Sequence, residues 1–220
     1  MGVAIGAEAV RRGAHVVLVL GPSALEPPRG AEVVRVRSAA EMHQAVMTRA
    51  PGMDAIVMAA AVADYTVAGG AQSEKISKHI DGPQGDAEDS LTVTLTRTAD
   101  ILADLGRWRA DSARPVLVGF AAETEDVVAS ATAKLTRKRG DLVVANDVSR
   151  SDTGFEVETN AAVLIDAAGA TELPLQLKTE LAGAILGRVE TRLRNTDTAD
   201  RAVPASTSAS VEGGTSHGSS

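Results

Sequence analysis

Residues Arg114 to Asp147, RPVLVGFAAETEDVVASATAKLTRKRGDLVVAND, decide the fold. This segment holds two short apolar runs, residues 114–124 and 141–147, and each run predicts a strand buried on both faces of a sheet. The residues between them predict a helix that ends at Gly140. A strand, a helix and a second strand joined by short connections predict two parallel strands with the helix as their crossover.

The same alternation of strands and helices continues on both sides of that segment. Expected helices are residues 1–12, 39–50 and 99–110, and expected strands are residues 14–20, 31–37, 53–60 and 91–98. Strand 53–60, MDAIVMAA, is apolar throughout and predicts burial on both faces, whereas 91–98, LTVTLTRT, alternates and predicts one wet face.

The last third of the chain has a different pattern. Residues 160–177 predict a hairpin that turns at Ala168 and Gly169, and residues 178–194 predict a final amphipathic helix. The whole pattern predicts an α/β fold of the Rossmann-like, doubly wound kind, with a mainly parallel sheet and a C-terminal β-hairpin and helix, in one domain of residues 1–194. Residues 195–220 hold almost no large apolar side chains, so we expect a disordered tail there.

Composition and charge exclude several classes of protein. The net charge is −7, so no global basic field favours binding to a nucleic acid polymer. The chain has no cysteine, which excludes disulfides, thiolate metal sites and cysteine nucleophiles. No apolar run reaches the roughly 18 residues of a membrane span. We therefore expect a cytoplasmic protein without a membrane partner.

Several familiar nucleotide and metal motifs are absent from the sequence. It contains no Walker A sequence and no dinucleotide-binding G-x-G-x-x-G. The single tyrosine, Tyr65, has Gly69 four residues on, so the tyrosine–lysine pair of short-chain dehydrogenases is absent. The four histidines show no metal-ligand spacing. Metal ligands stay unassigned from the sequence alone.

Three side chains follow the ends of expected strands, where ligands bind in doubly wound sheets. Asp64 could hold a metal or a ribose hydroxyl, or form an Asx turn. Phe120 could stack on a base, or fill the core. Asn146, with Asp147 beside it, could contact a ligand, or form a turn.

Basic residues gather in two places. Lys134 and Lys138 are four residues apart on the helix that precedes Gly140, so they share one helical face and repel each other. A triphosphate would explain this arrangement, and a solvated helix end is the alternative. Residues 60–83 are small, polar and rich in glycine, which predicts a mobile flap. Lys75 or Lys78 of that flap could close over an anion, or remain solvated.

Six short motifs occur in an order that resembles one enzyme family. They are AAAVADY, EKISK, ADILADLG, VGFAAETED, KLTRKRGDLVVANDVS and the helix that opens with KTELA. Over residues 1–193 they resemble the phosphopantothenate-cysteine ligase of coenzyme A synthesis, above all the bacterial form fused behind a flavin-dependent decarboxylase. That family joins 4'-phosphopantothenate to L-cysteine. CTP converts the substrate carboxylate to an acyl-cytidylate with release of pyrophosphate, and the cysteine amine then displaces CMP.

The resemblance implies roles for particular residues of this chain. Lys75 would be the flap lysine that covers the site and assists the chemistry, and Asp64 would lie at the triphosphate and its Mg²⁺. Phe120 would sit at the nucleotide base. The remaining nucleotide-binding positions would be Ala99, Asp100, Ile101, Leu102, Lys134, Lys138 and Asn146. The resemblance also implies a homodimer formed through the late hairpin and a flavin-dependent decarboxylase, either as an upstream domain or in trans.

The sequence departs from that family in three places. Lys75-Ile76-Ser77-Lys78 replaces a Lys-x-Lys-Lys flap, and Ala99 replaces a usual proline. The family's glycine-rich first strand and its Asn-Arg-Ser-Ser-Gly-Lys segment, which would end just ahead of Met1, are not among the 220 residues. That strand would be central in a 3-2-1-4 sheet, so we expect its two neighbours to face a gap with unpaired backbone groups.

Because unpaired buried groups cost on the order of 1 to 3 kcal/mol each, we expect this chain alone to be unstable or inactive. Two other functions stay open at this point. One is a catalytically degenerate nucleotide-binding or assembly subunit of the same fold. The other is a different Rossmann-type nucleotide enzyme. The sequence also leaves CTP and ATP as alternative nucleotides.

Overall fold

The computed structural model describes residues 1–70, 92–123, 127–147 and 159–202. The helices are α1 (Gly2–Arg11), α2 (Ala39–Arg49), α3 (Ile101–Arg109), α4 (Val127–Lys138) and α5 (Lys178–Ala202). The strands are β1 (Val17–Leu20), β2 (Glu32–Arg35), β3 (Ala55–Met58), β4 (Tyr65–Val67), β5 (Leu95–Arg97), β6 (Val116–Glu123), β7 (Leu142–Asp147), β8 (Thr159–Asp166) and β9 (Gly169–Leu177). No described helix has the length and apolar character needed to cross a membrane.

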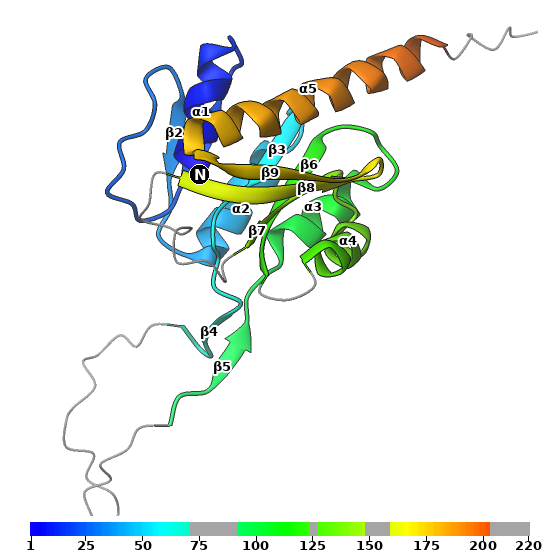
Figure 1. Ribbon diagram of the computed structural model, residues 1–220. Coiled ribbons are helices and arrows are strands. Elements are labelled where there is room, and N and C mark those ends of the chain that lie inside the picture. The colour runs from blue at the N-terminus through cyan, green and yellow to red at the C-terminus, as the bar shows by residue number, and fades with distance from the viewer. Residues whose placement is uncertain (71–91, 124–126, 148–158, 203–220) are drawn as a thin grey trace, which may run out of the picture.

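The main sheet has five strands in the order β3-β6-β7-β8-β9 (Figure 1). β3, β6 and β7 are parallel, with Val57 opposite Val118 and Val118 opposite Leu142. β8 and β9 form an antiparallel hairpin on β7, and the hairpin turns at residues 167–168. The predicted strand–helix–strand unit and the C-terminal hairpin are therefore confirmed, and so is the mainly parallel α/β fold.

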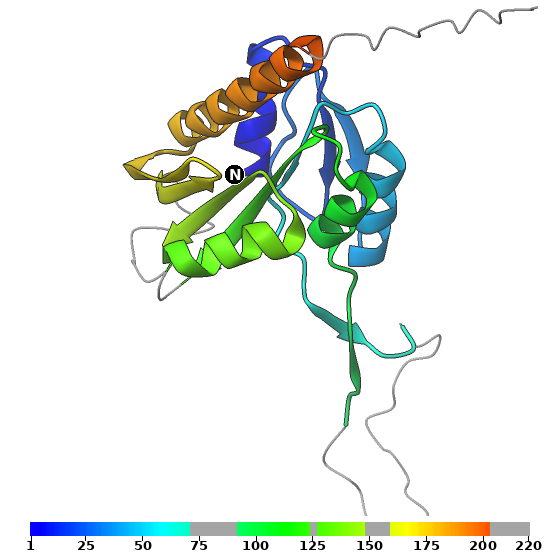
Figure 2. The same cartoon turned by 90° about the vertical axis from the view of Figure 1, so that its right-hand side faces the viewer.

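Helices cover both faces of this sheet (Figure 2). Val118 and Val144 point toward α1 and α5, where Leu181 and Ile185 complete a buried cluster. The next residues along the strands point to the opposite face. There Leu117 packs in a second cluster with residues of α2 and α3, and Val143 packs in a third cluster beneath α4. This alternation is why the strands read as continuous apolar runs.

β1 and β2 form a separate two-stranded parallel sheet, with Val19 opposite Val34. β3 is an edge strand of the main sheet, and no backbone pairing joins it to β1. The expected gap therefore lies between these two strands. Strand 53–60 was predicted to be buried on both faces, which is wrong: all four residues of β3 are half-buried, because one edge of β3 has no neighbouring strand.

The region around the predicted flap contains two short strands. β4 and β5 pair in antiparallel fashion, with Tyr65 opposite Arg97, and form a ribbon that projects from the body (Figure 1). The prediction of one mobile segment over residues 60–83 is therefore wrong for β4, and residues 71–83 lie outside the described part. Strand 91–98 was predicted to have one wet face; the residues of β5 are exposed on both, because the ribbon leaves the core.

The final helix is longer than the sequence predicted. α5 continues to Ala202, so the predicted boundary at residues 194–195 is too early. Thr196 is buried and donates its hydroxyl to Arg192 O at 3.1 Å, and Asp197 forms an ion pair with Arg114. These contacts extend the helix over residues whose composition is polar. The rest of the predicted tail, residues 203–220, lies outside the described residues.

Candidate active site

The carboxyl ends of β6 and β7 meet the N-terminus of α3 at one edge of the main sheet. We name the residues there the carboxyl-edge cluster: Asp100, Phe120, Lys134, Lys138 and Asn146. They come from four different elements, namely α3, β6, α4 and β7. Ligands of doubly wound folds bind at this edge, so the position agrees with the prediction from the sequence.

Lys134 lies on α4 and reaches back to the strand that precedes this helix. Its Nζ donates to Phe120 O at 3.0 Å, and the side chain is half-buried. The Phe120 ring is also half-buried and packs against the core cluster beneath α1 and α5. The contact places an ammonium group at the carboxyl end of β6, where a phosphate group could meet it.

Lys138 lies one turn further along α4 and meets the start of α3. Its Nζ is 2.9 Å from Asp100 Oδ2, and the lysine side chain is 15% exposed. Asp100 is also the N-cap of α3, because its Oδ1 accepts the Ala103 N–H at 3.1 Å. Burial raises the pKa of the Asp100 carboxyl, but the bonds from Lys138 and from Ala103 N–H lower it more, so the net pKa is below its ordinary value.

Two glycines allow α3 to approach its neighbours closely. A Cβ at Gly106 would lie 2.1 Å from Lys138 O, so no larger residue fits there without movement of the α4 C-terminus. A Cβ at Gly119 would lie 2.5 Å from Leu102 Cδ2. This packing brings the last turn of α4 beside the first turn of α3, and so brings Lys138 within reach of Asp100.

Asn146 is joined to a residue that the sequence analysis did not select. Asn160 Nδ2 donates to Asn146 Oδ1 at 3.2 Å, and Asn160 is only 4% exposed. A buried amide needs a hydrogen-bond partner, so this pair fixes the orientation of the Asn146 side chain. The signal in the sequence was an asparagine directly ahead of the apolar run AAVLID.

Asp64 and Ala99 lie at the base of the β4–β5 ribbon, next to α3. Asp64 O accepts Thr98 N–H at 3.0 Å, which places Asp64 beside the residue that precedes Ala99. Both side chains are exposed, and no described residue bonds to the Asp64 carboxylate. Within the described ranges, no group of three histidine, cysteine or acidic side chains could hold a metal ion.

Two other predicted positions and the flap lysine need separate statements. Ile101 and Leu102 are 4% and 7% exposed and pack in the core with Leu117. A nucleotide at this edge could therefore reach only their backbone groups, at the helix N-terminus, where N–H groups favour anions. Lys75 lies outside the described residues.

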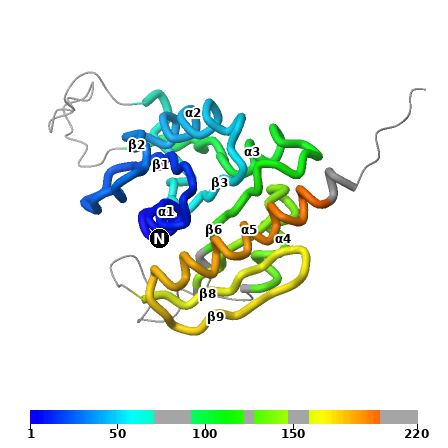
Figure 3. The backbone as a smooth tube through the Cα atoms, turned by 90° about the horizontal axis from the view of Figure 1, so that it is seen from above, coloured from blue at the N-terminus to red at the C-terminus, as the bar shows by residue number. Residues whose placement is uncertain are grey.

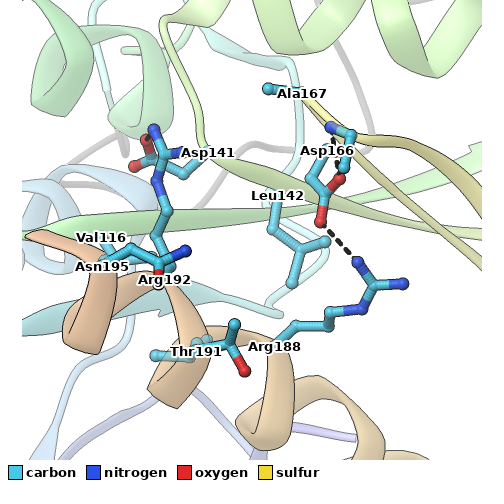
Figure 4. Close-up of a pocket in the computed structure, with 11 residues that line it drawn as sticks. Val116, Asp141, Leu142, Asp166, Ala167, Arg188, Thr191, Arg192 and Asn195 are labelled. Carbon is cyan, nitrogen blue, oxygen red and sulfur yellow. Dashed lines mark hydrogen bonds and ion pairs between the residues drawn. The ribbon is translucent and has the colours of Figure 1, made fainter.

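A second charged pocket, of about 150 Å³, lies at the opposite edge of the sheet, at the amino ends of β6 and β7 (Figure 4). Arg188 donates to Asp166 Oδ2 at 2.9 Å and to Thr171 Oγ1 at 2.6 Å, and Arg192 is 3.3 Å from Asp141 Oδ1. These charges already neutralise one another. The pocket contains none of the predicted site residues, and its ion pairs tie α5 to the sheet.

Comparison with known proteins identifies the family. Residues 1–193 match the model of the DNA/pantothenate metabolism flavoprotein C-terminal domain. The chain belongs to this family. The expected resemblance to the ligase part of the bifunctional coenzyme A protein is thus confirmed.

Relatives of the DNA/pantothenate metabolism flavoprotein C-terminal domain include whole proteins and solved domains. The chain is 40% identical over 191 residues to the coenzyme A biosynthesis bifunctional protein CoaBC of Vibrio vulnificus, a match that covers 87% of this chain and 45% of that protein. The chain therefore spans about half the length of that curated relative. A crystal structure of the C-terminal domain of CoaBC is similar with 35% identity and a TM-score of 0.68, covering 88% of this chain and 82% of the other.

A more distant structure shares the fold. It is a mutant of Cab2 in complex with phosphopantothenate-cysteine, with 16% identity and a TM-score of 0.57, covering 78% of this chain and 56% of the other. This likeness concerns the arrangement of helices and strands, and the ligand is that of the Cab2 complex.

Proposed function

We propose that this chain is the part of a coenzyme A biosynthesis enzyme that joins 4'-phosphopantothenate to L-cysteine with CTP. Family membership supports an enzyme of coenzyme A synthesis. The observation that carries the finer proposal is that Lys134 and Lys138 both turn from α4 to the carboxyl edge of the sheet, where they meet Phe120 O and Asp100. Two ammonium groups on one helical face match a polyphosphate ligand.

The proposed reaction has two steps. A carboxylate oxygen of 4'-phosphopantothenate attacks the α-phosphorus of CTP, and the bond to pyrophosphate breaks. The cysteine amine then attacks the carbonyl carbon of the acyl-cytidylate, CMP leaves, and the amine loses a proton. Lys134 and Lys138 would neutralise the negative charge that develops on the phosphate groups. Phe120 would lie against the base, and Lys75 would complete the site from the flap.

Mg²⁺ is part of the proposal, and the donor set agrees with it. Mg²⁺ is usually held by one or two carboxylates together with substrate phosphates, not by a cage of protein ligands. Asp64 offers one exposed carboxylate to which no described residue bonds. Asp64 would hold the ion beside the triphosphate, and the ion would offset phosphate charge.

Three further predictions about the assembly stay proposals. They are a homodimer formed through the β8–β9 hairpin, a flavin-dependent decarboxylase as a neighbouring domain or a separate chain, and a cytoplasmic location. An assembly role without turnover is a second candidate, because the unpaired edges of β1 and β3 leave the sheet divided beside the site. Nucleotide binding without turnover would support this second candidate.

The test measures pyrophosphate released from CTP or ATP when residues 1–220 receive Mg²⁺, 4'-phosphopantothenate and cysteine. We expect release with CTP, and we expect Lys138→Met to lower kcat/KM about 100-fold, since a charge that stabilises the transition state is lost. Arg107→Ala is the control: this exposed residue on the last turn of α3 pairs with Asp104 and should leave the rate unchanged. Equal rates for Lys138→Met and the unmodified chain, or release with ATP alone, would contradict the proposal.

A further inference from the structure

A groove of about 670 Å³ separates β1 from β3. Residues 16–20 line one side of it and residues 54–60 line the other. Seen from above, α1 lies in front of the space between the two strands (Figure 3). The groove therefore interrupts the sheet layer while helices still cover its faces.

Backbone hydrogen bonds show which groups of β1 face the groove. Glu32 N–H donates to Val16 O at 2.9 Å, and β1 and β2 are parallel in this register. In a strand, the hydrogen-bonding groups of successive residues point to opposite edges. The even-numbered residues of β1 thus serve β2, and Val17 and Val19 present their N–H and C=O groups to the groove.

The same reasoning applies to β3 on the other side. Val116 N–H donates to Asp54 O at 2.8 Å, so the even-numbered residues of this strand serve β6. Ala55 and Val57 then present their N–H and C=O groups to the groove. Two rows of donors and acceptors thus face each other across it, and a strand is the structure that satisfies both rows.

The two rows run in the same direction. α1 begins beside the carboxyl end of β3, because a Cβ at Gly2 would lie 3.7 Å from Ala59 Cβ. α1 ends beside the amino end of β1, since Gly13 leads directly into that strand. β1 and β3 are therefore parallel to each other. A strand parallel to both would end at the carboxyl edge, next to Met1, which also lines the groove.

The faces of the groove define the chemistry of its occupant. Ile5 of α1 and Val189 of α5 line one face, and Met42 and Val46 of α2 line the other. A strand between these layers would be buried on both sides, which favours small and β-branched apolar residues. Since β1 and β3 have four residues each, the matching segment has about four residues.

The amino group of Met1 gives an independent indication of where the segment attaches. Burial lowers the pKa of this amino group, and Lys178 lowers it further. The group also stands at the N-terminus of α1, where the helix dipole disfavours positive charge. An amide bond at Met1 would remove the charge from this position.

We propose that the groove is a binding site for one extended polypeptide strand of apolar, β-branched residues, which runs parallel to β1 and β3 and leads through a short turn into α1 at Met1. The strand would join the two-stranded and five-stranded sheets into one. This proposal concerns the body of the fold and does not depend on the proposed reaction.

The test compares extensions fused ahead of Met1 of the full chain. The first carries Val-Ile-Val-Val and a three-residue glycine-rich turn, and a second version adds two lysines in front to keep it soluble. The matched control replaces the two central residues of the strand with proline, which cannot donate to a ladder. Hydrogen exchange is then measured at the amides of Val19 and Val57, with the melting temperature and the oligomeric state.

We expect both strand extensions to slow exchange at Val19 and Val57 about tenfold or more and to raise the melting temperature, while the proline control does neither. Unchanged exchange, or equal protection by the proline control, would overturn the proposal. Equal protection by the free four-residue peptide would overturn attachment at Met1. Protection that appears only in a dimer of the unmodified chain would assign the groove to a second copy.

Discussion

The β6–β7 region and the β1–β2 region have similar apolar sequences but different environments. Val116, Leu117 and Val118 of β6 are at most 1% exposed, because β6 has a strand on each edge and helices on both faces. Every residue of β1 is half-buried, although VLVL is as apolar as any run in the chain. The comparison shows that burial depends on neighbouring strands, which a local sequence pattern does not report.

The largest difference should come from buried charge in the β6–β7 region. The Arg109 and Asp141 side chains are each 8% exposed and form an ion pair, and Arg109 also donates to Pro115 O and Arg139 O. Arg109→Met leaves these acceptors without their donor, and we expect a loss of about 3–5 kcal/mol in the free energy of unfolding.

The matched change in the other region is Arg49→Met. Arg49 Nε is 4.0 Å from Glu32 Oε1, and both side chains are exposed by more than a third. We expect an effect of no more than about 0.5 kcal/mol. Urea denaturation measures both variants, and similar losses for the two would break the comparison.

A smaller difference is expected from a pair of leucines. Leu117 is fully buried, so Leu117→Ala should cost about 2–5 kcal/mol. Leu18 is half-buried and lines the groove, so Leu18→Ala should cost about 1 kcal/mol. Chemical denaturation of both variants gives the two values, and a loss at Leu18 equal to that at Leu117 would show that β1 is packed as tightly as β6.

The smallest effect is the pH dependence of Asp100, which lies in the better-packed region. Its pKa in the folded chain is below the ordinary value, so the ionised carboxylate stabilises the fold above the unfolded pKa. This contribution is lost as the pH falls through the folded pKa. Asp100→Asn should therefore lower the unfolding free energy near pH 6, by less than about 1 kcal/mol for so exposed a pair, and should have little effect near pH 2.5.

Thermal melts of Asp100→Asn and the unmodified chain at both pH values check this expectation. Ser38→Ala is the control, because Ser38 caps α2 through a hydroxyl that does not titrate in this range. Its effect should be the same at both pH values. A loss for Asp100→Asn that persists near pH 2.5 would assign the stabilisation to the cap and not to the charge.

The sequence predicted the fold where structure is set by local pattern. The apolar runs of β6 and β7, the crossover helix with Gly140 after it and the turn of the hairpin all followed from spacing alone. The half-buried state of β3 did not follow, because it depends on what lies beside the strand. The continuation of α5 was also missed, since the Arg114–Asp197 pair joins residues far apart in the chain.

The candidate site could be predicted in part for the same reason. Lys134 and Lys138 were predicted to share a helical face, and they do meet the sheet edge together. Their partners, Phe120 O and Asp100, depend on the close approach at Gly106, which helical spacing does not reveal. Asn160 was missed because an asparagine at the start of a strand shows its buried amide partner only in three dimensions.

The most direct test of the account is amide hydrogen exchange on the unmodified chain, read residue by residue. We predict an alternating pattern in the two strands beside the groove: Val19 and Val57 exchange about tenfold or more faster than Leu18 and Ile56, whose amides face β2 and β6. Residues Val143 and Val144 of β7, which has a strand on each edge, should both be protected. Equal protection of Val19 and Leu18, and of Val57 and Ile56, would contradict the division of the sheet.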